Sequence, residues 1–185
     1  MKTLSDDQLY IAFIKGNNAS FDELMVRYGD SLTYYLWGKL GDMQEAEDLM
    51  IEAFARILVR KPRIREGNFK AYLFKVGKNL VSRFYSRSRS RDHFSLEEMY
   101  QELSDSYFHE DRMLDDERDH ILHLCLERID PMMREALWLV YFEDLSYAET
   151  AEVMNVSVKK IDNLLSRGKK RLREELEKEG VDHAY

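Results

Sequence analysis

The segment LSYAETAEVMNVSVKKIDNLLSRGKKRL, residues 145–172, decides the fold that we expect for the second half of the chain. Ser146 stands three residues before Glu149, the spacing of a capping box at a helix N-terminus. Ser157 is placed to cap a second, longer helix, and Asn155 lies in the turn between the two. Asparagine tolerates the left-handed backbone conformation that a tight turn requires. The segment therefore predicts two helices joined by a tight turn.

The apolar and basic residues of this segment predict its packing and its partner. Ala151 is small enough for two helices to cross closely, and Ile161 and Leu164 are spaced to face the first helix. This combination is typical of a DNA-binding helix-turn-helix, whose second helix enters the major groove. An ordinary helical hairpin shares some of these features. The residues expected to reach base edges are Lys160, Asp162, Asn163, Ser166 and Arg167, and those expected to meet phosphates are Lys169, Lys170, Arg171 and Arg173.

Composition predicts a soluble, mostly helical protein. The 185 residues have room for one medium domain or two small ones, and only two of them are proline. A single cysteine, Cys125, excludes an internal disulfide and favours the reducing cytoplasm. No apolar run is long enough for a membrane span, so membrane insertion is not expected. We predict an all-α protein.

Charge is distributed in blocks, although the formal net charge is -7. Residues 60–91 hold eleven lysines and arginines against one glutamate, and residues 92–119 hold eleven acids against two arginines. Two basic surfaces separated by an acidic connector indicate a nucleic-acid partner, although solvated helix faces are the plain alternative. The predicted organisation is a helical domain over 1–91, an acidic linker with some helix over 92–119, and a helix-turn-helix domain over 120–185.

Several further helix signals support this organisation. Capping residues are expected at Ser5, Ser20, Asp42, Asn68 and Asp130, the last followed by proline. Helical spacing predicts one buried stripe at Ala46, Leu49, Met50, Ala53, Phe54, Ile57 and Leu58, and another at Tyr72, Leu73, Val76, Leu80, Val81 and Phe84. The opposite face of the second helix carries Lys70, Lys75, Lys78, Asn79 and Arg83.

The order of these parts resembles a known family, the bacterial RNA polymerase sigma factors of the extracytoplasmic-function (ECF) group. GDMQEAEDLMIEAFARI and GNFKAYLFKVGKNLVSRFYSRSR resemble its promoter-melting domain, and the residues 129–176 resemble its second DNA-binding domain. The resemblance implies a transcription initiation factor with core RNA polymerase and promoter DNA as partners. It further implies an anti-sigma factor partner. The sequence itself gives no sign of a nucleotide or metal cofactor, so neither is expected.

The resemblance also assigns roles to residues. Asp48, Leu49 and Glu52 would dock on the polymerase clamp, with Ile51 standing where the family commonly has glutamine. The -10 element would be recognised and opened by Arg63, Arg65, Asn68, Lys75, Asn79, Arg83 and Arg87. The -35 element would be read by the second helix of the helix-turn-helix. Asp162 and Leu164 replace basic residues there. Either the promoter sequence read is unusual, or contact with the groove shifts toward Lys159, Lys160 and Arg167.

Other classes of protein remain as alternatives. One is a helix-turn-helix regulator that binds DNA as a dimer without polymerase, but no dimerisation heptad is evident. Another is a helical adaptor that binds only protein. An enzyme is not expected, because the chain has no phosphate-binding glycine loop and no cysteine pair at zinc spacing. His120, His123 and Cys125 are too crowded on one helix to share a face as metal ligands.

Overall fold

The computed structural model describes residues 4–89 and 117–181. These residues form helices and contain no strand, and the chain divides into two compact units, Met1–His93 and Phe94–Tyr185. The expected all-α class with two helical domains is therefore confirmed. Most of the predicted acidic linker, residues 92–116, lies outside the described residues, so the three predicted boundaries stay predictions.

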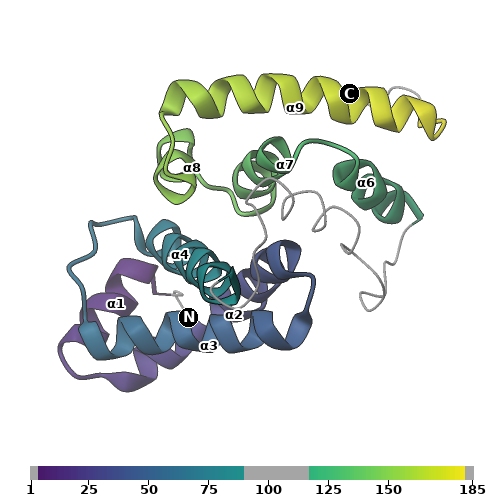
Figure 1. The fold of residues 1–185 in the computed structure, drawn as a ribbon. Helices are drawn as coiled ribbons and strands as arrows, with labels where there is room; N and C mark the ends of the chain where they lie inside the picture. Colours follow the sequence, from purple (N-terminus) through teal and green to yellow (C-terminus); the bar gives the residue numbers. More distant parts are fainter. Residues whose placement is uncertain (1–3, 90–116, 182–185) are drawn as a thin grey trace. The chain divides into compact units, whose positions relative to one another are not determined.

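The first unit is a bundle of four helices in which α2 is central: α1 (Asp6–Ile14), α2 (Asn18–Leu40), α3 (Met43–Arg60) and α4 (Phe69–Arg89). Helix α2 contacts each of the other three (Figure 1). The aromatic rings of Phe13, Phe21 and Phe54 form a continuous row, with centroids 4.5 and 5.9 Å apart. Burying each such ring removes apolar surface from water and stabilises the unit by roughly 1.5–3 kcal/mol.

The predicted helix starts of this unit are mostly confirmed. Ser5 forms a complete capping box with Gln8, and the Asp42 carboxylate accepts from the Glu45 amide at 2.9 Å. The start predicted at Ser20 is wrong, because α2 already begins at Asn18 and the Ser20 side chain is buried inside the helix. An S-x-x-E spacing in the middle of a helix satisfies no exposed amide, so the pattern alone does not fix the boundary.

Both predicted buried stripes need correction. On α3, Leu58 is 42% exposed and Met50 is only half-buried, whereas the other five predicted positions are buried. Leu58 follows the buried Ile57 and is turned by about 100° around the helix, toward solvent. On α4, Phe69 and Phe74 are buried although the predicted stripe leaves them out, and Tyr72 is half-buried. Val76 and Phe84 are half-buried too.

The second unit is organised around one long helix. Its elements are α6 (Glu117–Glu127), α7 (Pro131–Leu137), the π-helical segment η1 (Trp138–Phe142), α8 (Tyr147–Met154) and α9 (Val158–Lys178). Figure 1 shows α9 extending along α8, α7 and α6, and it contacts all three. At Gly168 a Cβ would lie 3.1 Å from Leu137 Cδ1, so the absence of a side chain permits the close approach of α9 to α7.

The connection from α7 to α8 begins with a π-helical segment. Asp130 caps α7 as predicted, accepting from the Met132 and Met133 amides at 2.9 and 3.2 Å. Beyond α7 the chain continues as the π-helical segment η1, in which the Trp138 and Phe142 rings stack at 4.6 Å. The Trp138 indole N–H donates to the buried Glu143 carboxylate at 3.2 Å. A polar group at the end of this helix is thereby buried with a partner, which holds the turn into α8.

Candidate functional site

Helices α8 and α9 form the predicted helix-turn-helix. Ser146 makes the complete capping box with Glu149, and Ser157 accepts from the Lys160 amide at 3.2 Å. Asn155 adopts the left-handed conformation, with φ 55° and ψ 46°, and ends α8. These local features are confirmed because each depends on hydrogen bonds between residues only three or four positions apart.

Helix α9 has one buried face and one exposed face. Ile161, Leu164, Leu165 and Gly168 are buried at spacings of three and four, as expected for one stripe of a helix. The predicted DNA-contact residues of this helix are all exposed: Lys159, Lys160, Asp162, Asn163, Ser166, Arg167, Lys170 and Arg171. The packing therefore leaves all eight residues accessible to a partner. Leu164, which stands where the family usually has a basic residue, is instead a core residue that holds the turn.

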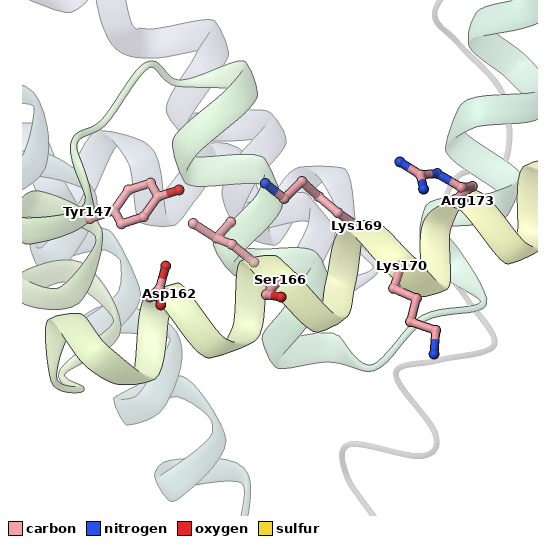
Figure 2. A pocket seen from close by; sticks show the side chains of 7 residues that line it. Tyr147, Asp162, Ser166, Lys169, Lys170 and Arg173 are labelled. Atoms are coloured by element: carbon pink, nitrogen blue, oxygen red, sulfur yellow. The ribbon is translucent and has the colours of Figure 1, made fainter. Parts of the chain in front are cut away.

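An open depression of about 450 Å³ lies between the start of α8 and the exposed face of α9. It is lined by Tyr147, Asp162, Leu165, Ser166, Lys169, Lys170 and Arg173. In Figure 2, Tyr147 and Asp162 lie toward one end of the depression, and Lys169, Lys170 and Arg173 follow along α9. Cationic side chains suit phosphate oxygens, and a carboxylate suits an amino-group donor such as that of cytosine.

The residues that line the depression differ from the predicted site. Tyr147 has no predicted role in binding, and only the packing of α8 against α9 brings it to this face. Arg171 does not line the depression, and its guanidinium donates to Glu174 Oε2 at 3.0 Å. At about 100° per residue, Lys160 and Arg171 lie on the flank of α9 away from Lys169. The exposed face is thus divided between a mixed-charge depression and a separate basic flank.

Helix α4 presents the predicted basic stripe of the first unit. Lys75, Asn79 and Arg83 follow at intervals of four, so they share one side of the helix. Asn79, Arg83 and Arg87 are exposed, and Lys75 is half-buried. The opposite side packs on α2, where a Cβ on Gly77 would lie 3.0 Å from Leu32 Cδ1. Close packing on one side therefore orients the polar stripe toward solvent.

The loop between α3 and α4, residues 61–68, carries the remaining predicted -10 residues. Arg63 and Arg65 are exposed, and Asn68 is half-buried immediately before α4 begins. Lys61, at the start of the loop, and Gly67, near its end, have positive φ of 45° and 74°. The loop therefore projects two cationic side chains from a backbone that turns sharply at both ends.

The predicted docking face on α3 is only partly at the surface. Asp48 is exposed, but Leu49 is only 8% exposed and packs in the core. Glu52 is half-buried and accepts from Arg56 of its own helix at 2.6 and 2.9 Å. The same side of α3 exposes three aliphatic residues, Ile51, Leu58 and Val59, at 53%, 42% and 81%, and the prediction places only Ile51 on the docking face. This face combines one exposed acid with an apolar strip.

The remaining predictions concern the single cysteine, a metal site and a membrane span. Cys125 is buried, and burial is the main cause that raises the pKa of its thiol. Over residues 4–89 and 117–181, no three histidine, cysteine or acidic side chains are gathered as a metal site would require. Within the same ranges no helix combines the length and the apolar character needed to cross a membrane.

Comparison with protein families gives two matches along the chain. Residues 24–102 match the model described as sigma-70 region 2, and residues 119–172 match the model described as sigma-70 region 4. The first match includes most of α2, all of α3 and α4, and the loop 61–68. The second includes α6 from Asp119 onward, α7, η1, α8, and α9 as far as Leu172.

Individual relatives carry consistent names. The ECF RNA polymerase sigma factor BldN of Streptomyces coelicolor is 30% identical over 141 residues, which are 75% of this chain but 53% of BldN. The ECF RNA polymerase sigma factor SigW of Bacillus subtilis is 25% identical over 173 residues, 88% of this chain and 91% of SigW. The fold resembles that of RpoE from Bartonella quintana, solved with the anti-sigma factor NepR. The TM-score is 0.63 at 24% identity, over 88% of this chain and 98% of that one.

Proposed function

Because the chain belongs to the sigma-70 family, in its extracytoplasmic-function (ECF) group, we propose that it binds core RNA polymerase and directs it to promoters. The observation that carries the proposal is the pairing of two units with separate exposed polar faces. One is the α4 stripe with the loop 61–68, and the other is the exposed face of α9. Two separate basic surfaces suit two separate elements of one promoter.

The exposed face of α9 reads the -35 element in this proposal. A helix of this kind fits the major groove, where each base pair presents a distinct pattern of donors and acceptors. Asn163 and Arg167 lie on the exposed face and carry side chains able to pair with base edges. Lys159 and Lys170 supply the phosphate contacts that give affinity without sequence information. Asp162, in the depression beside Tyr147, favours a cytosine amino group and disfavours a nearby phosphate.

The first unit recognises and opens the -10 element in this proposal. Strand opening without fuel requires that unstacked bases and the exposed strand be held by cationic and aromatic groups. The stripe of Lys75, Asn79 and Arg83 would follow the backbone of that strand. Arg63 and Arg65 on the loop would lie against the melted bases, and Arg87 would extend the phosphate contacts. Tyr72 is half-buried on α4 and so leaves part of its ring available for stacking.

The polymerase-docking surface in this proposal is the exposed side of α3. Asp48 offers a charge to a basic partner, and Ile51 with Leu58 and Val59 offers apolar area that a partner would remove from water. Leu49 would not contact the polymerase itself, because it is buried; it would hold α3 on the core of the first unit.

Further partners and the setting complete the proposal. RpoE of Bartonella quintana was solved with an anti-sigma factor, and we extend that type of partner to this chain. The chain would act in the cytoplasm, where polymerase and promoter DNA are found. It would carry no catalytic step of its own, since polymerase performs the chemistry.

The test is co-purification with core polymerase, followed by promoter binding at several salt concentrations. The log of the affinity should fall with the log of salt by about 0.9 per phosphate neutralised. Lys170→Ala should reduce that slope by about one phosphate. Lys178→Ala is the matched control on the same helix, because Lys178 pairs with Glu175 at 2.5 Å, and it should leave the slope unchanged.

Three outcomes would contradict the proposal. A stable homodimer that binds DNA without polymerase would indicate a helix-turn-helix regulator instead. Binding to polymerase with no salt-dependent promoter binding would indicate a protein-only adaptor. Equal slopes for the two lysine variants would exclude this face of α9 as the DNA-binding surface.

A further inference from the structure

Helix α1 contacts the loop 61–68 near both ends of the loop. The Tyr10 hydroxyl donates to the Pro62 carbonyl at 2.6 Å. The Gly67 amide donates to both oxygens of the Asp7 carboxylate, at 2.9 and 3.0 Å. The Lys61 ammonium lies 4.9 Å from the centroid of the Phe13 ring. These contacts join residues more than forty positions apart, so they fix the loop to the bundle rather than to its neighbours in sequence.

The loop needs such support because little within it defines its backbone. Its two ends have positive φ, and Lys61 is not a glycine, so its conformation there is unfavourable by itself. Within the loop, Pro62 has a fixed φ, and the Asn68 amide donates to the Arg65 carbonyl at 3.0 Å. Without outside contacts a segment of this kind samples many conformations.

Helix α1 is itself anchored to the core of the first unit, so its contacts hold the loop in a fixed position relative to that core. Its Asp6 carboxylate accepts from Arg27 of α2 at 3.0 Å and from the Tyr28 hydroxyl. Leu9, Tyr10 and Phe13 are buried. Burial, with the nearby Tyr72, raises the pKa of Tyr10 to about 12, so its hydroxyl remains protonated and able to donate near neutral pH.

We propose that Asp7 and Tyr10 are positioning residues for promoter opening, which hold the loop 61–68 so that Arg63 and Arg65 meet the melted -10 strand. The inference rests on the proposed function of that loop. Helix α1 precedes residue 24, where the region 2 match begins, so the matched segment itself does not contain these two residues. Sequence recognition at the -10 element would thus depend on a helix outside the matched region.

The first test measures hydrogen exchange at the Gly67 amide in the full chain, without polymerase or DNA. In Asp7→Ala the exchange should accelerate by about tenfold or more, because the amide loses a charged acceptor. Asp7→Asn keeps one acceptor oxygen and should restore most of the protection. Asp22→Ala, an exposed acid on α2, is the matched control and should change nothing. Unchanged exchange in Asp7→Ala would overturn the inference.

The second test measures base preference with a library of promoters and polymerase loaded with each variant. Asp7→Ala and Tyr10→Phe should flatten the preference at the -10 element several-fold while leaving the preference at the -35 element unchanged. Asp7→Asn should recover it. A merely structural loss would reduce transcription from all promoters equally, and that result would overturn the positioning role. So would faster exchange at Gly67 with an unaltered -10 preference.

Failure of the underlying function gives a different pattern. If the unaltered chain supports no polymerase-dependent transcription, then the proposed function fails and the promoter role of Asp7 and Tyr10 fails with it. The protection of the Gly67 amide would still be observed in that case, because it is measured on the chain alone.

Discussion

Replacing Asn155 by alanine tests whether the turn of the helix-turn-helix requires a left-handed backbone conformation at this residue. Asn155 lies between α8 and α9 with φ 55°, and its side chain is exposed, so the change removes no core packing. The left-handed conformation costs ordinary residues roughly 1–2 kcal/mol, and asparagine pays less. Asn155→Ala should therefore destabilise the second unit by about 1 kcal/mol. Asn155→Gly should cost little, because glycine adopts positive φ freely.

The chain offers a matched control for this change in Asn163. Asn163 is also exposed but lies inside α9, where alanine is the better helix former by up to about 0.7 kcal/mol. The same exchange of atoms should therefore stabilise the unit at residue 163 and destabilise it at residue 155. Opposite signs from one substitution cannot come from a general effect of losing an amide side chain.

Thermal unfolding of the full chain provides the measurement. The chain has two tryptophans, Trp37 in the first unit and Trp138 in the second, so a Trp37→Phe background makes fluorescence report on the second unit. For a unit of this size, 1 kcal/mol corresponds to about 4–8 °C in Tm. Asn155→Ala should lower Tm by about that amount, and Asn163→Ala should raise it by a smaller one. An unchanged or higher Tm for Asn155→Ala would refute the reasoning.

Two further changes test the packing of the units. Burial raises the pKa of Tyr85 to about 12, above the value near 10 of an unfolded chain, and its hydroxyl bonds to the Lys39 carbonyl at 2.7 Å. Below pH 10 the contribution of Tyr85 to the free energy of unfolding is complete. Above pH 10 the unfolded state binds fewer protons than the folded state, so the free energy of unfolding should fall, by up to about 1.4 kcal/mol per pH unit, until pH 12. The urea midpoint of Tyr85→Phe should fall less steeply over that range, and an equal fall would contradict the raised pKa of the Tyr85 hydroxyl. Gly168→Val should destabilise the second unit by about 1–3 kcal/mol, because α9 approaches α7 too closely for a larger side chain. An unaltered Tm would show that the two helices can separate without cost.

The sequence predicts features that depend on neighbouring residues better than those that depend on the whole fold. The caps at Ser146, Asp130 and Ser5 are confirmed, because each bonds to an amide two or three positions away. The cap at Ser20 is wrong, since the same local pattern recurs inside α2. Leu58 is wrong as a core residue, because it lies about 100° around α3 from the buried Ile57, and periodicity does not state how wide the buried face is.

The candidate site follows the same rule. Exposure of Asn163 and Arg167 follows from the buried spacing of Ile161 and Leu164, which the sequence contains. Tyr147 joins the depression only through the crossing of α8 and α9, which no periodicity encodes. The bonds from α1 to the loop 61–68 are equally absent from the pattern, because they connect residues 52 and 60 positions apart.

Two surfaces of the first unit also differ in how far the sequence predicts them. The basic stripe of α4 is visible as residues four apart. The apolar strip on α3 is only partly visible, because periodicity leaves Ile51 and Val59 out of the core but assigns Leu58 to it. Only the packed structure separates Ile57, which is buried, from Leu58, which is 42% exposed.

The most direct measurement mixes the purified chain with core RNA polymerase and a library of promoter sequences, and then maps transcript start sites. Our account predicts new starts that all lie downstream of one recurring pair of sequence elements, with the upstream preference altered by Arg167→Ala and the opening step impaired by Lys75→Ala together with Asn79→Ala. Start sites identical to those of core polymerase without the chain would contradict it.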